Sequence, residues 1–325
     1  MTDAVAQEFC KRIRGVKERE SMALKTAFRI GGEARLSVTA QTTDDLAEAV
    51  MAAAALSIPY AVIGGGTNVL VADTGFPGVM IQAGCRVITI KDTFVTAEAG
   101  AVSAMVARQS VDAALDGFAW AAGLPGTIGG ATYGNAGCFG GEMKDVIASV
   151  EAIRLRDGAR VTLLQDDCHF SYRASMFKQE PHLILSVTLE LSHATDAAAA
   201  RERMTSIMRE RRAHQPQGAF SCGCVFQNYT IRDETDLAVL RREGIEIPAE
   251  MIRRNSISAG WLIDQAGLKG ERIGGIAVSA VHGNFFENRG KATAADVVML
   301  ISFVKRKVRD ELGIELTEEV QYIGF

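Results

Sequence analysis

The chain has 325 residues, of which 48% are hydrophobic and 23% are charged, and its formal net charge is −4. These values describe a globular protein of two or three domains, because one hydrophobic core rarely serves more than about 250 to 300 residues. Lys and Arg are interleaved with Asp and Glu, so no basic face of the kind that follows a nucleic-acid backbone is expected.

The N-terminal third predicts alternating helices and strands. Val5, Phe9, Ile13 and Val16 have helical spacing and no continuous apolar stretch, which indicates a short amphipathic helix rather than a signal peptide. No later run approaches the roughly 18 apolar residues that cross a bilayer, so we expect a cytoplasmic protein without a membrane anchor. The predicted elements that follow are a helix over 46–56 and strands over 60–63, 69–71, 79–81, 87–90 and 94–97.

The rest of the chain continues as an α+β pattern. Strands are predicted near 150–155 and over 183–191, and polar residues 192–198 suggest a boundary before a charged helix over 199–213. Thr293 and Asp296 have capping-box spacing at the start of a last helix that Gly313 ends. A final strand is expected over 314–323.

Three consecutive glycines follow the strand at 60–63, in the segment VIGGGTNVLV. Loops without Cβ atoms let backbone N–H groups approach a pyrophosphate closely, because glycine tolerates positive φ and successive amides form an anion-binding nest. The dinucleotide fingerprint GxGxxG is absent, since Val69 stands at its third glycine, and no GK[ST] follows. The loop therefore predicts either phosphate binding outside those two classes or a tight connection.

A second segment, GLPGTIGGATYGNAGCFGGE over 123–142, contains eight glycines. Flexible linkers are rich in Ser and other polar residues, whereas this loop carries Ile128, Tyr133 and Phe139, which would pack against a flat surface. We interpret the loop as part of a binding site, with a plain connection as the alternative.

The six cysteines are scattered through the chain and form no disulfide framework, so most are expected to be buried small hydrophobic residues. Cys222 and Cys224 with His214 suggest a metal site only weakly, because CxC with one distant His lacks the paired spacing of structural zinc. We predict no metal site.

Seven segments in order give the chain a resemblance to a known family. KTAFRIGG at 25–32, the two glycine loops, FSYRASMFK at 170–178, AGWLIDQAGLKG at 259–270, IGGIAVSAVHGNFFEN at 273–288 and LTEEVQYIG at 316–324 together resemble the UDP-N-acetylenolpyruvoylglucosamine reductase (MurB) family. The resemblance runs from about Lys25 to the C-terminus, in the shorter form of the family.

The resemblance implies a vanillyl-alcohol-oxidase-type (PCMH-type) FAD-binding region of two α+β subdomains, followed by an α+β substrate-binding domain. The expected division is a helical extension over 1–23, FAD-binding subdomains over 24–85 and 86–198, and a substrate domain over 199–325 whose C-terminal segment returns to the active site. The implied cofactors are non-covalent FAD and NADPH, the implied partner is a nucleotide-sugar substrate, and a monomer is expected.

The implied reaction passes hydride from NADPH to FAD and on to the enolpyruvyl group of UDP-N-acetylglucosamine enolpyruvate, giving UDP-N-acetylmuramate for peptidoglycan and cell-wall synthesis. Arg173 matches the family arginine of SYRxS and would polarise the substrate carboxylate, and Glu319 would assist protonation. The family motif GSxFxN has a serine proton donor where SCGCVFQN places Cys224. A thiol of pKa about 8.5 is protonated at neutral pH and could replace it, or Cys224 could be inert.

Further site residues follow from the same motifs. Tyr172, Asn228 and Gln265 are the predicted substrate-binding residues. The predicted cofactor-binding residues lie in the two glycine-rich segments and are Gly64, Gly65, Gly66, Thr67, Asn68, Val69, Gly123, Pro125, Gly126, Thr127, Gly129, Gly130, Ala131, Asn135 and Gly137.

Two other functions stay open at this stage. One is another flavin oxidoreductase on the same scaffold, although residues 60–72 contain no His or Cys to tether flavin. The other is a non-catalytic flavin- or nucleotide-binding relative, which the change from Ser to Cys and about thirty extra residues over 229–258 make conceivable. Retention of both Arg173 and Glu319 argues against it.

Overall fold

The computed structural model describes residues 1–233, 237–238, 240 and 244–325. The chain divides into two compact units, each assembled from three segments. Unit 1 comprises 1–20, 34–65 and 76–213, and unit 2 comprises 21–33, 66–75 and 214–325. Among the helices of the described residues, none has the length and apolar character that a bilayer crossing requires.

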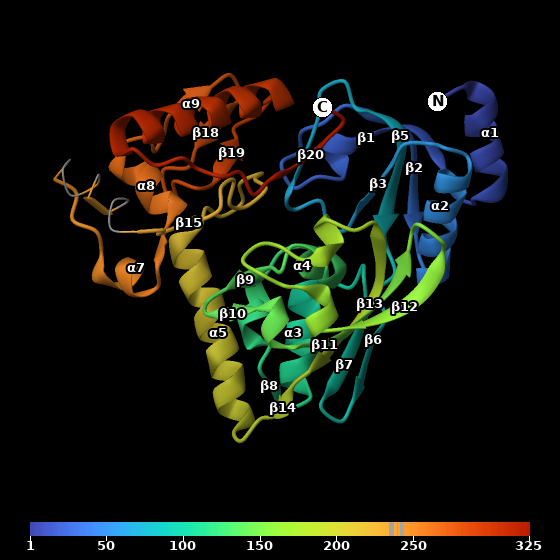
Figure 1. Ribbon diagram of the computed structural model, residues 1–325, viewed down its shortest axis with the longest axis horizontal. Helices are drawn as coiled ribbons and strands as arrows, with labels where there is room; N and C mark the ends of the chain where they lie inside the picture. The colour runs from blue at the N-terminus through green and yellow to red at the C-terminus, as the bar shows by residue number, and fades with distance from the viewer. Residues whose placement is uncertain (234–236, 239, 241–243) are drawn as a thin grey trace. The chain divides into compact units, whose positions relative to one another are not determined.

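Unit 1 contains a four-stranded sheet in the order β1-β2-β5-β3, formed by β1 (Lys17–Ser21), β2 (Glu33–Ala40), β5 (Phe76–Ala83) and β3 (Tyr60–Ile63). β5 lies between β2 and β3, and both of these strands run parallel to it. The helices α1 (Asp3–Arg12) and α2 (Thr43–Ala55) lie beside this sheet (Figure 1). Their apolar faces bury Phe9 and Leu46 in the core that β2 and β5 share.

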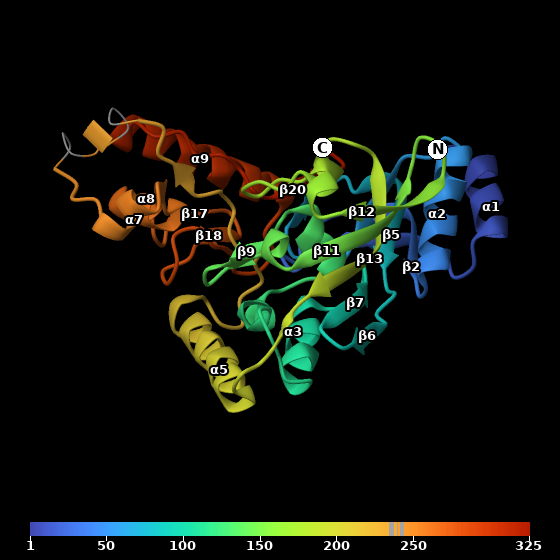
Figure 2. The same ribbon diagram turned by 60° about the horizontal axis from the view of Figure 1, so that its bottom comes forward.

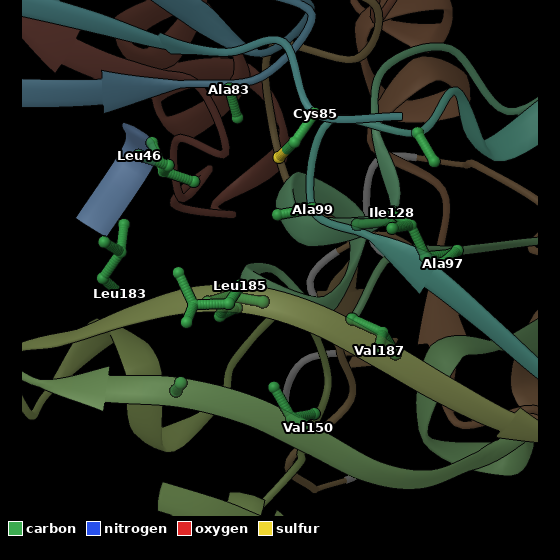
Figure 3. Close-up of a cluster of buried hydrophobic side chains, with 14 of the residues drawn as sticks. Leu46, Ala83, Cys85, Ala97, Ala99, Ile128, Val150, Leu183, Leu185 and Val187 are labelled. Atoms are coloured by element: carbon green, nitrogen blue, oxygen red, sulfur yellow. The ribbon is translucent and has the colours of Figure 1, made fainter. Parts of the chain in front are cut away.

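A second sheet of unit 1 is antiparallel and five-stranded, in the order β12-β11-β13-β7-β6. Its strands are β6 (Ile88–Lys91), β7 (Phe94–Glu98), β11 (Ile147–Arg154), β12 (Ala159–Leu164) and β13 (His182–Glu190). Alternation in β13 buries Leu183, Leu185, Val187 and Leu189. Figure 3 shows Leu185 and Val187 of this strand among Ala97, Ala99 and Ile128, in the core that also contains Leu46 of α2.

The remaining elements of unit 1 include those formed by the second glycine segment itself and the helices α3 (Ser103–Asp112) and α5 (Ala197–His214), which are labelled in Figure 2. They also include α4 (Ile128–Tyr133) and the short strands β8 (Leu115–Asp116), β9 (Gly137–Cys138), β10 (Gly141–Glu142) and β14 (Ser192–His193). The prediction of an irregular loop over 123–142 is therefore wrong in part. The Thr127 hydroxyl accepts a hydrogen bond from the Gly130 N–H, and burial of Ile128 completes a short helix.

Unit 2 is built around α9 (Ala294–Leu312), which begins with the predicted capping box of Thr293 and Asp296 and ends at Gly313 in the left-handed conformation. In the described part of the unit, the strands are β4 (Val69–Val71), β15 (Tyr229–Thr230), β16 (Ser256–Ile257), β17 (Arg272–Ile273), β18 (Ile276–Val278), β19 (Phe286–Asn288) and β20 (Gln321–Ile323). Further helices include α7 (Ala249–Arg253) and α8 (Ala259–Gln265). β17, β18 and β19 form an antiparallel sheet.

The final strand is shorter than expected, because only Gln321–Ile323 pairs with a strand, running parallel to β4. Residues 314–320 form an isolated bridge from Glu318 to Phe226, and they bury Leu316 and Val320 in the core of unit 2. The predicted strand over 314–323 is thus wrong for most of its length. The apolar residues pack as an irregular segment rather than as part of a sheet.

The extra residues over 229–258 contribute to the core of unit 2. β15 and β16 pair antiparallel, with Tyr229 opposite Ile257, and Leu237, Leu240 and Ile247 are buried against the same core as α9. Residues 234–236, 239 and 241–243 of this insertion lie outside the described part of the chain. The predicted domain boundaries after residues 23, 85 and 198 stay predictions.

Candidate active site

The two predicted glycine loops approach each other inside unit 1. A Cβ atom added at Gly64 would lie 2.1 Å from Oγ1 of Thr127, far inside any normal contact. The Gln82 side chain donates a hydrogen bond to the Gly64 carbonyl at 3.3 Å. Only glycine allows the end of β3 to pass this close to the start of α4.

The α4 segment is docked by backbone hydrogen bonds against the residues that follow β7. The Ile128 N–H donates to Ala101 at 2.8 Å, and the Gly129 N–H donates to Ala99 at 3.0 Å. A Cβ atom at Gly129 would lie 2.8 Å from the Ala99 Cβ, so this glycine allows the contact. Ala131 is buried on the same helix, and Gly126 precedes the helix at a φ of +96°.

Several polar groups near these loops lack a protein partner. Within the described residues, the buried hydroxyls of Ser103 and Thr132 have no hydrogen-bond partner. Over the same part of the chain, the N–H groups of Gly65, Gly66 and Thr67 donate to no backbone carbonyl. The two buried hydroxyls are expected to bind a ligand or water, because buried polar groups are rarely left unsatisfied. Gly65 and Thr67 are not fully buried, and consecutive free amides suit a pyrophosphate. Neither Ser103 nor Thr132 was among the predicted site residues.

The second half of the glycine segment forms a hairpin of β9 and β10 that α5 contacts. A Cβ atom at Gly123 would lie 2.6 Å from Cδ of Arg211, and the Arg211 guanidinium lies 3.8 Å from Sγ of Cys138. The same guanidinium lies over the Phe139 ring, 5.9 Å from its centroid. Burial raises the pKa of Cys138 despite the opposing charge of Arg211, so this thiol stays protonated at neutral pH.

Arg173 lies at the tip of a tight turn in unit 1. Ser171 and Ala174 exchange backbone hydrogen bonds of 3.0 and 3.1 Å, which leaves Tyr172 and Arg173 as the two turn residues. Arg173 has a φ of +55°, a conformation that non-glycine residues rarely adopt and that often marks functional positions. Its guanidinium donates to the Gly137 carbonyl at 3.0 Å and lies over the Tyr172 ring.

Asn135 connects this turn to the glycine hairpin. Its amide nitrogen donates to the Ser171 carbonyl at 2.9 Å and to the Glu142 carboxylate at 3.0 Å, and its amide oxygen accepts from the Lys144 N–H at 3.0 Å. The side chain is fully buried. Both donors of Asn135 are therefore used by protein groups, which makes it a positioning residue for the Arg173 turn. Its predicted contact with the cofactor stays a prediction.

Unit 2 contains the rest of the first glycine loop. A Cβ atom at Gly66, where φ is +62°, would lie 2.1 Å from the Lys25 carbonyl oxygen. The Asn68 side chain donates to the Glu319 carbonyl at 3.1 Å, and the Gln321 N–H donates to the Asn68 carbonyl at 3.0 Å. Asn68, predicted as a cofactor residue, thus anchors the C-terminal motif, and Val69 begins the strand that pairs with it.

Cys224 and Glu319 lie on two adjacent extended segments of unit 2. The Glu319 N–H donates to the Val225 carbonyl at 2.8 Å, and both side chains are half-buried. On the other side, the Val225 N–H donates to the Asn284 carbonyl at 2.9 Å. The buried Asn284 amide also donates to and accepts from the Phe226 backbone, at 2.7 and 2.9 Å. Asn284 therefore fixes the register of the Cys224 segment, a role that its sequence position alone does not indicate.

The electrostatics around these segments favour a neutral Cys222 and a charged Glu318. Burial raises the pKa of Cys222 well above its usual value, and Cys224 and Glu319 raise it further. The pKa of Glu318 is lowered although burial opposes this, because Lys305 and Tyr322 donate to its carboxylate. Burial and the bond to Glu318 raise the pKa of Tyr322, which stays protonated.

The predicted substrate residues are dispersed over both units. Tyr172 is exposed beside Arg173 in unit 1. In unit 2, the Asn228 side chain accepts a hydrogen bond from the Ala259 N–H at the start of α8, at 3.2 Å, and Gln265 is exposed at the end of that helix. Cys222, Cys224 and His214 form no metal cluster, and no group of three His, Cys, Asp or Glu residues able to hold a metal occurs in the described residues.

Two known families match separate parts of the chain. The FAD binding domain matches residues 34–164, which lie mostly in unit 1. The C-terminal domain of UDP-N-acetylenolpyruvoylglucosamine reductase matches residues 215–323, which lie in unit 2. The first match covers the segments in which Gly64 approaches Thr127, and the second covers Cys224 and Glu319.

Similar proteins extend over nearly the whole chain. The UDP-N-acetylenolpyruvoylglucosamine reductase of Solibacter usitatus is 33% identical over 93% of this chain and 95% of its own length. That of Desulfosudis oleivorans is 36% identical over 95% of each chain. The crystal structure of the same reductase from Thermus caldophilus is similar with a TM-score of 0.74 and 30% identity, over 94% of this chain and 98% of that one.

The fold and the glycine-lined site of unit 1 define an α+β flavoprotein of the vanillyl-alcohol-oxidase (PCMH) type, as the sequence predicted. Within that class, the chain belongs to the UDP-N-acetylenolpyruvoylglucosamine reductase family. The predicted family and fold class are therefore confirmed.

Proposed function

We propose that the chain is an NADPH-dependent, FAD-containing reductase that converts UDP-N-acetylglucosamine enolpyruvate into UDP-N-acetylmuramate for peptidoglycan synthesis. The observation that carries the proposal is the pairing of the Cys224 and Glu319 segments, through the 2.8 Å hydrogen bond from Glu319 to Val225, at the two motif positions that the family uses for proton transfer. Relatives of nearly full length bear the name of this reductase. Because NADPH and nucleotide sugars are intracellular metabolites, we place the activity in the cytoplasm; a monomer stays a prediction.

The residues of the glycine-rich segments fit FAD. Gly64, which lies against Thr127, has no Cβ atom to cover the loop. The unpartnered hydroxyls of Ser103 and Thr132 are available to a ligand. We propose that the amides of Gly65, Gly66 and Thr67 hold the pyrophosphate and that the α4 segment lines the rest of the cofactor site. When bound, FAD supplies hydride that originates from NADPH.

Addition of hydride to the terminal enolpyruvyl carbon leaves negative charge on the carbon next to the carboxylate. The Arg173 guanidinium is fixed by its turn and by Gly137, so its planar fork can bind the carboxylate without losing much conformational freedom. A charge held in place before the reaction stabilises the developing enolate more than a mobile one would. We assign this role to Arg173.

The second step is protonation of that carbon. We assign the role of proton donor to the Cys224 thiol, which occupies the position of the serine in the family motif. Cys224 is half-buried beside the Glu319 segment. The Glu319 carboxylate would orient the thiol and help return a proton to it after each turnover. Asn284 and Asn68 hold the two segments through their backbones and act as positioning residues.

The proposal is tested by an assay of the purified, FAD-loaded protein. We expect NADPH oxidation only when UDP-N-acetylglucosamine enolpyruvate is present, with one UDP-N-acetylmuramate formed for each NADPH consumed. The control is the same assay with UDP-N-acetylglucosamine, which lacks the enolpyruvyl group. Equal NADPH oxidation with both nucleotides, accompanied by peroxide, would instead indicate an oxidase.

A further inference from the structure

Cys222 and Cys224 are separated only by Gly223, and the reaction uses just one of the two thiols. Cys224 is half-buried, whereas Cys222 is 3% exposed, and the pKa of Cys222 is raised by burial and then by Cys224 and Glu319. We propose that Cys224 is a site of oxidation by hydroperoxides and that Cys222 captures the oxidised sulfur as a Cys222–Cys224 disulfide. The proposal rests on the proposed function for its effect on activity, but not for the chemistry of the two thiols.

The backbone between the thiols permits this bond. Two residues of fully extended chain span about 7 Å, and disulfides join Cα atoms about 4.4 to 6.8 Å apart. Even a fully extended chain therefore places these two Cα atoms near the upper end of the disulfide range, and Gly223 has a φ of +80°, which is not the extended conformation. An added Cβ atom at Gly223 would meet nothing within 4 Å, so the peptide has room to rotate as the bond closes.

Backbone hydrogen bonds hold the chain on one side of the pair, whereas Cys222, on the other side, is packed in the core of unit 2. Beyond Cys224, hydrogen bonds to Asn284 and Glu319 hold both backbone groups of Val225. Before it, the Gly223 N–H makes a local bond of 3.2 Å to the Ser221 hydroxyl, which a small rotation can keep or replace. Closure of the disulfide therefore requires movement of Cys222 and Gly223 while the Val225 register stays in place.

The order of reaction follows from burial. A hydroperoxide reaches the half-buried Cys224 first, and its thiolate attacks the peroxide oxygen, giving a sulfenic acid and releasing an alcohol or water. The Cys222 thiolate then attacks that sulfur, forming the disulfide and releasing water, so one peroxide is reduced and two thiols are oxidised. Because burial raises the pKa of Cys222, the second step should accelerate as the pH rises.

The consequence is a reversible loss of the proton donor. A disulfide sulfur carries no proton, so the oxidised protein cannot protonate the substrate through Cys224. A dithiol would restore both thiols by exchange. Capture by Cys222 also protects Cys224 from irreversible oxidation to sulfinic acid.

The test uses hydrogen peroxide, followed by tryptic peptide mass analysis and activity measurement. Trypsin cleaves after Arg212 and Arg232, and the peptide 213–232 contains Cys222 and Cys224 and no other cysteine. After peroxide, this peptide from the wild type should lose two hydrogen atoms, and dithiothreitol should restore it. Turnover should fall at least about tenfold and recover with the peptide.

Two variants control the experiment. Cys222→Ala should keep the unoxidised rate but gain two or three oxygens on Cys224 after peroxide, with no recovery by dithiothreitol; Cys222→Ser serves if the alanine variant is insoluble. Cys224→Ser should show no mass change in the same peptide. Oxygen addition to the wild-type peptide without loss of two hydrogens would overturn the proposal. The peptide masses answer this even if the protein proves to have another activity.

Discussion

Single residues in this protein are held by partners that lie far away along the chain. Asn68 bonds to Glu319 across 251 positions, and Asn284 bonds to Phe226 across 58. In each case an amide side chain satisfies backbone groups of a segment that carries a predicted catalytic residue. The rigidity of those segments therefore depends on side chains that never need to touch a substrate.

Replacement of Cys224 tests its chemical role. Cys224→Ala should lower the turnover rate about 10²- to 10⁴-fold, because it removes a general acid. Cys224→Ser should retain much of the rate, because a hydroxyl can donate a proton from the same position and is the group that the family motif carries. The measurement is NADPH oxidation at saturating substrate.

Cys222→Ala is the matched control for these variants, since it removes a neighbouring thiol that the reaction does not use. Equal rates for the wild type and for both Cys224 variants would show that Cys224 is inert. Binding of FAD, followed by its visible absorbance, should be unchanged in all of them.

The sequence located the catalytic candidates but not all their contacts. Arg173, Cys224 and Glu319 were identified from motifs, which state the residue type and its neighbours. That Asn135 supports the Arg173 turn, or that Asn228 bonds to the start of α8, depends on tertiary contacts that no local pattern encodes. The buried hydroxyls of Ser103 and Thr132 could have been noticed only through their lack of partners in the fold.

Among the elements, α9 shows how local chemistry decides a helix boundary. The Thr293 hydroxyl accepts from the Asp296 N–H at 3.0 Å, and the Asp296 carboxylate accepts from the Thr293 N–H at 3.0 Å and the Gly275 N–H at 3.2 Å. These bonds lower the pKa of Asp296 although slight burial opposes them. The ionised carboxylate is therefore more stable in the folded than in the unfolded chain.

Thr293→Ala should reduce the free energy of unfolding by about 1 kcal/mol, because it removes the N-cap acceptor. The measurement is urea unfolding at neutral pH. The exposed Thr89, on strand β6, provides the control: Thr89→Ala should change stability by less than about 0.5 kcal/mol. Similar losses for the two variants would contradict the capping argument.

The same cap predicts a pH dependence. The folded pKa of Asp296 is below its unfolded value of about 3.9, so its contribution is complete above that value and is lost as the pH falls through the folded pKa. The stability difference between the wild type and Asp296→Asn should therefore shrink in acid. A difference that stays constant down to pH about 2 would exclude this carboxylate as the cause.

Elements with strong local signals were predicted well. α2, α5, α9 and the strands β3, β4, β7 and β13 lie within a few residues of their predicted positions, because capping residues, apolar periodicity and turns agree there. The α4 helix was missed because its glycines disfavour a helix on their own, and docking against Ala99 and Ala101 compensates for this. Residues 314–320 were wrongly predicted as a strand, because buried and more exposed residues alternate there although the segment pairs with no strand.

At the scale of the whole molecule, the chain passes repeatedly between two units. Unit 2 takes residues 21–33 and 66–75 from the N-terminal third, and β4 there pairs with β20 from the C-terminus. A prediction made in chain order cannot anticipate such interleaving, because local patterns do not state which unit a short segment joins. The family resemblance supplied the fold class that periodicity alone left open.

The central claim is that the chain reduces an enolpyruvyl ether by hydride addition followed by protonation next to the carboxylate. It is tested most directly by turnover in D₂O with NADPH and UDP-N-acetylglucosamine enolpyruvate, followed by NMR of the product. We predict UDP-N-acetylmuramate with deuterium on the carbon next to the carboxylate. Product with only protium on that carbon, or NADPH oxidation with no UDP-N-acetylmuramate, would contradict the account.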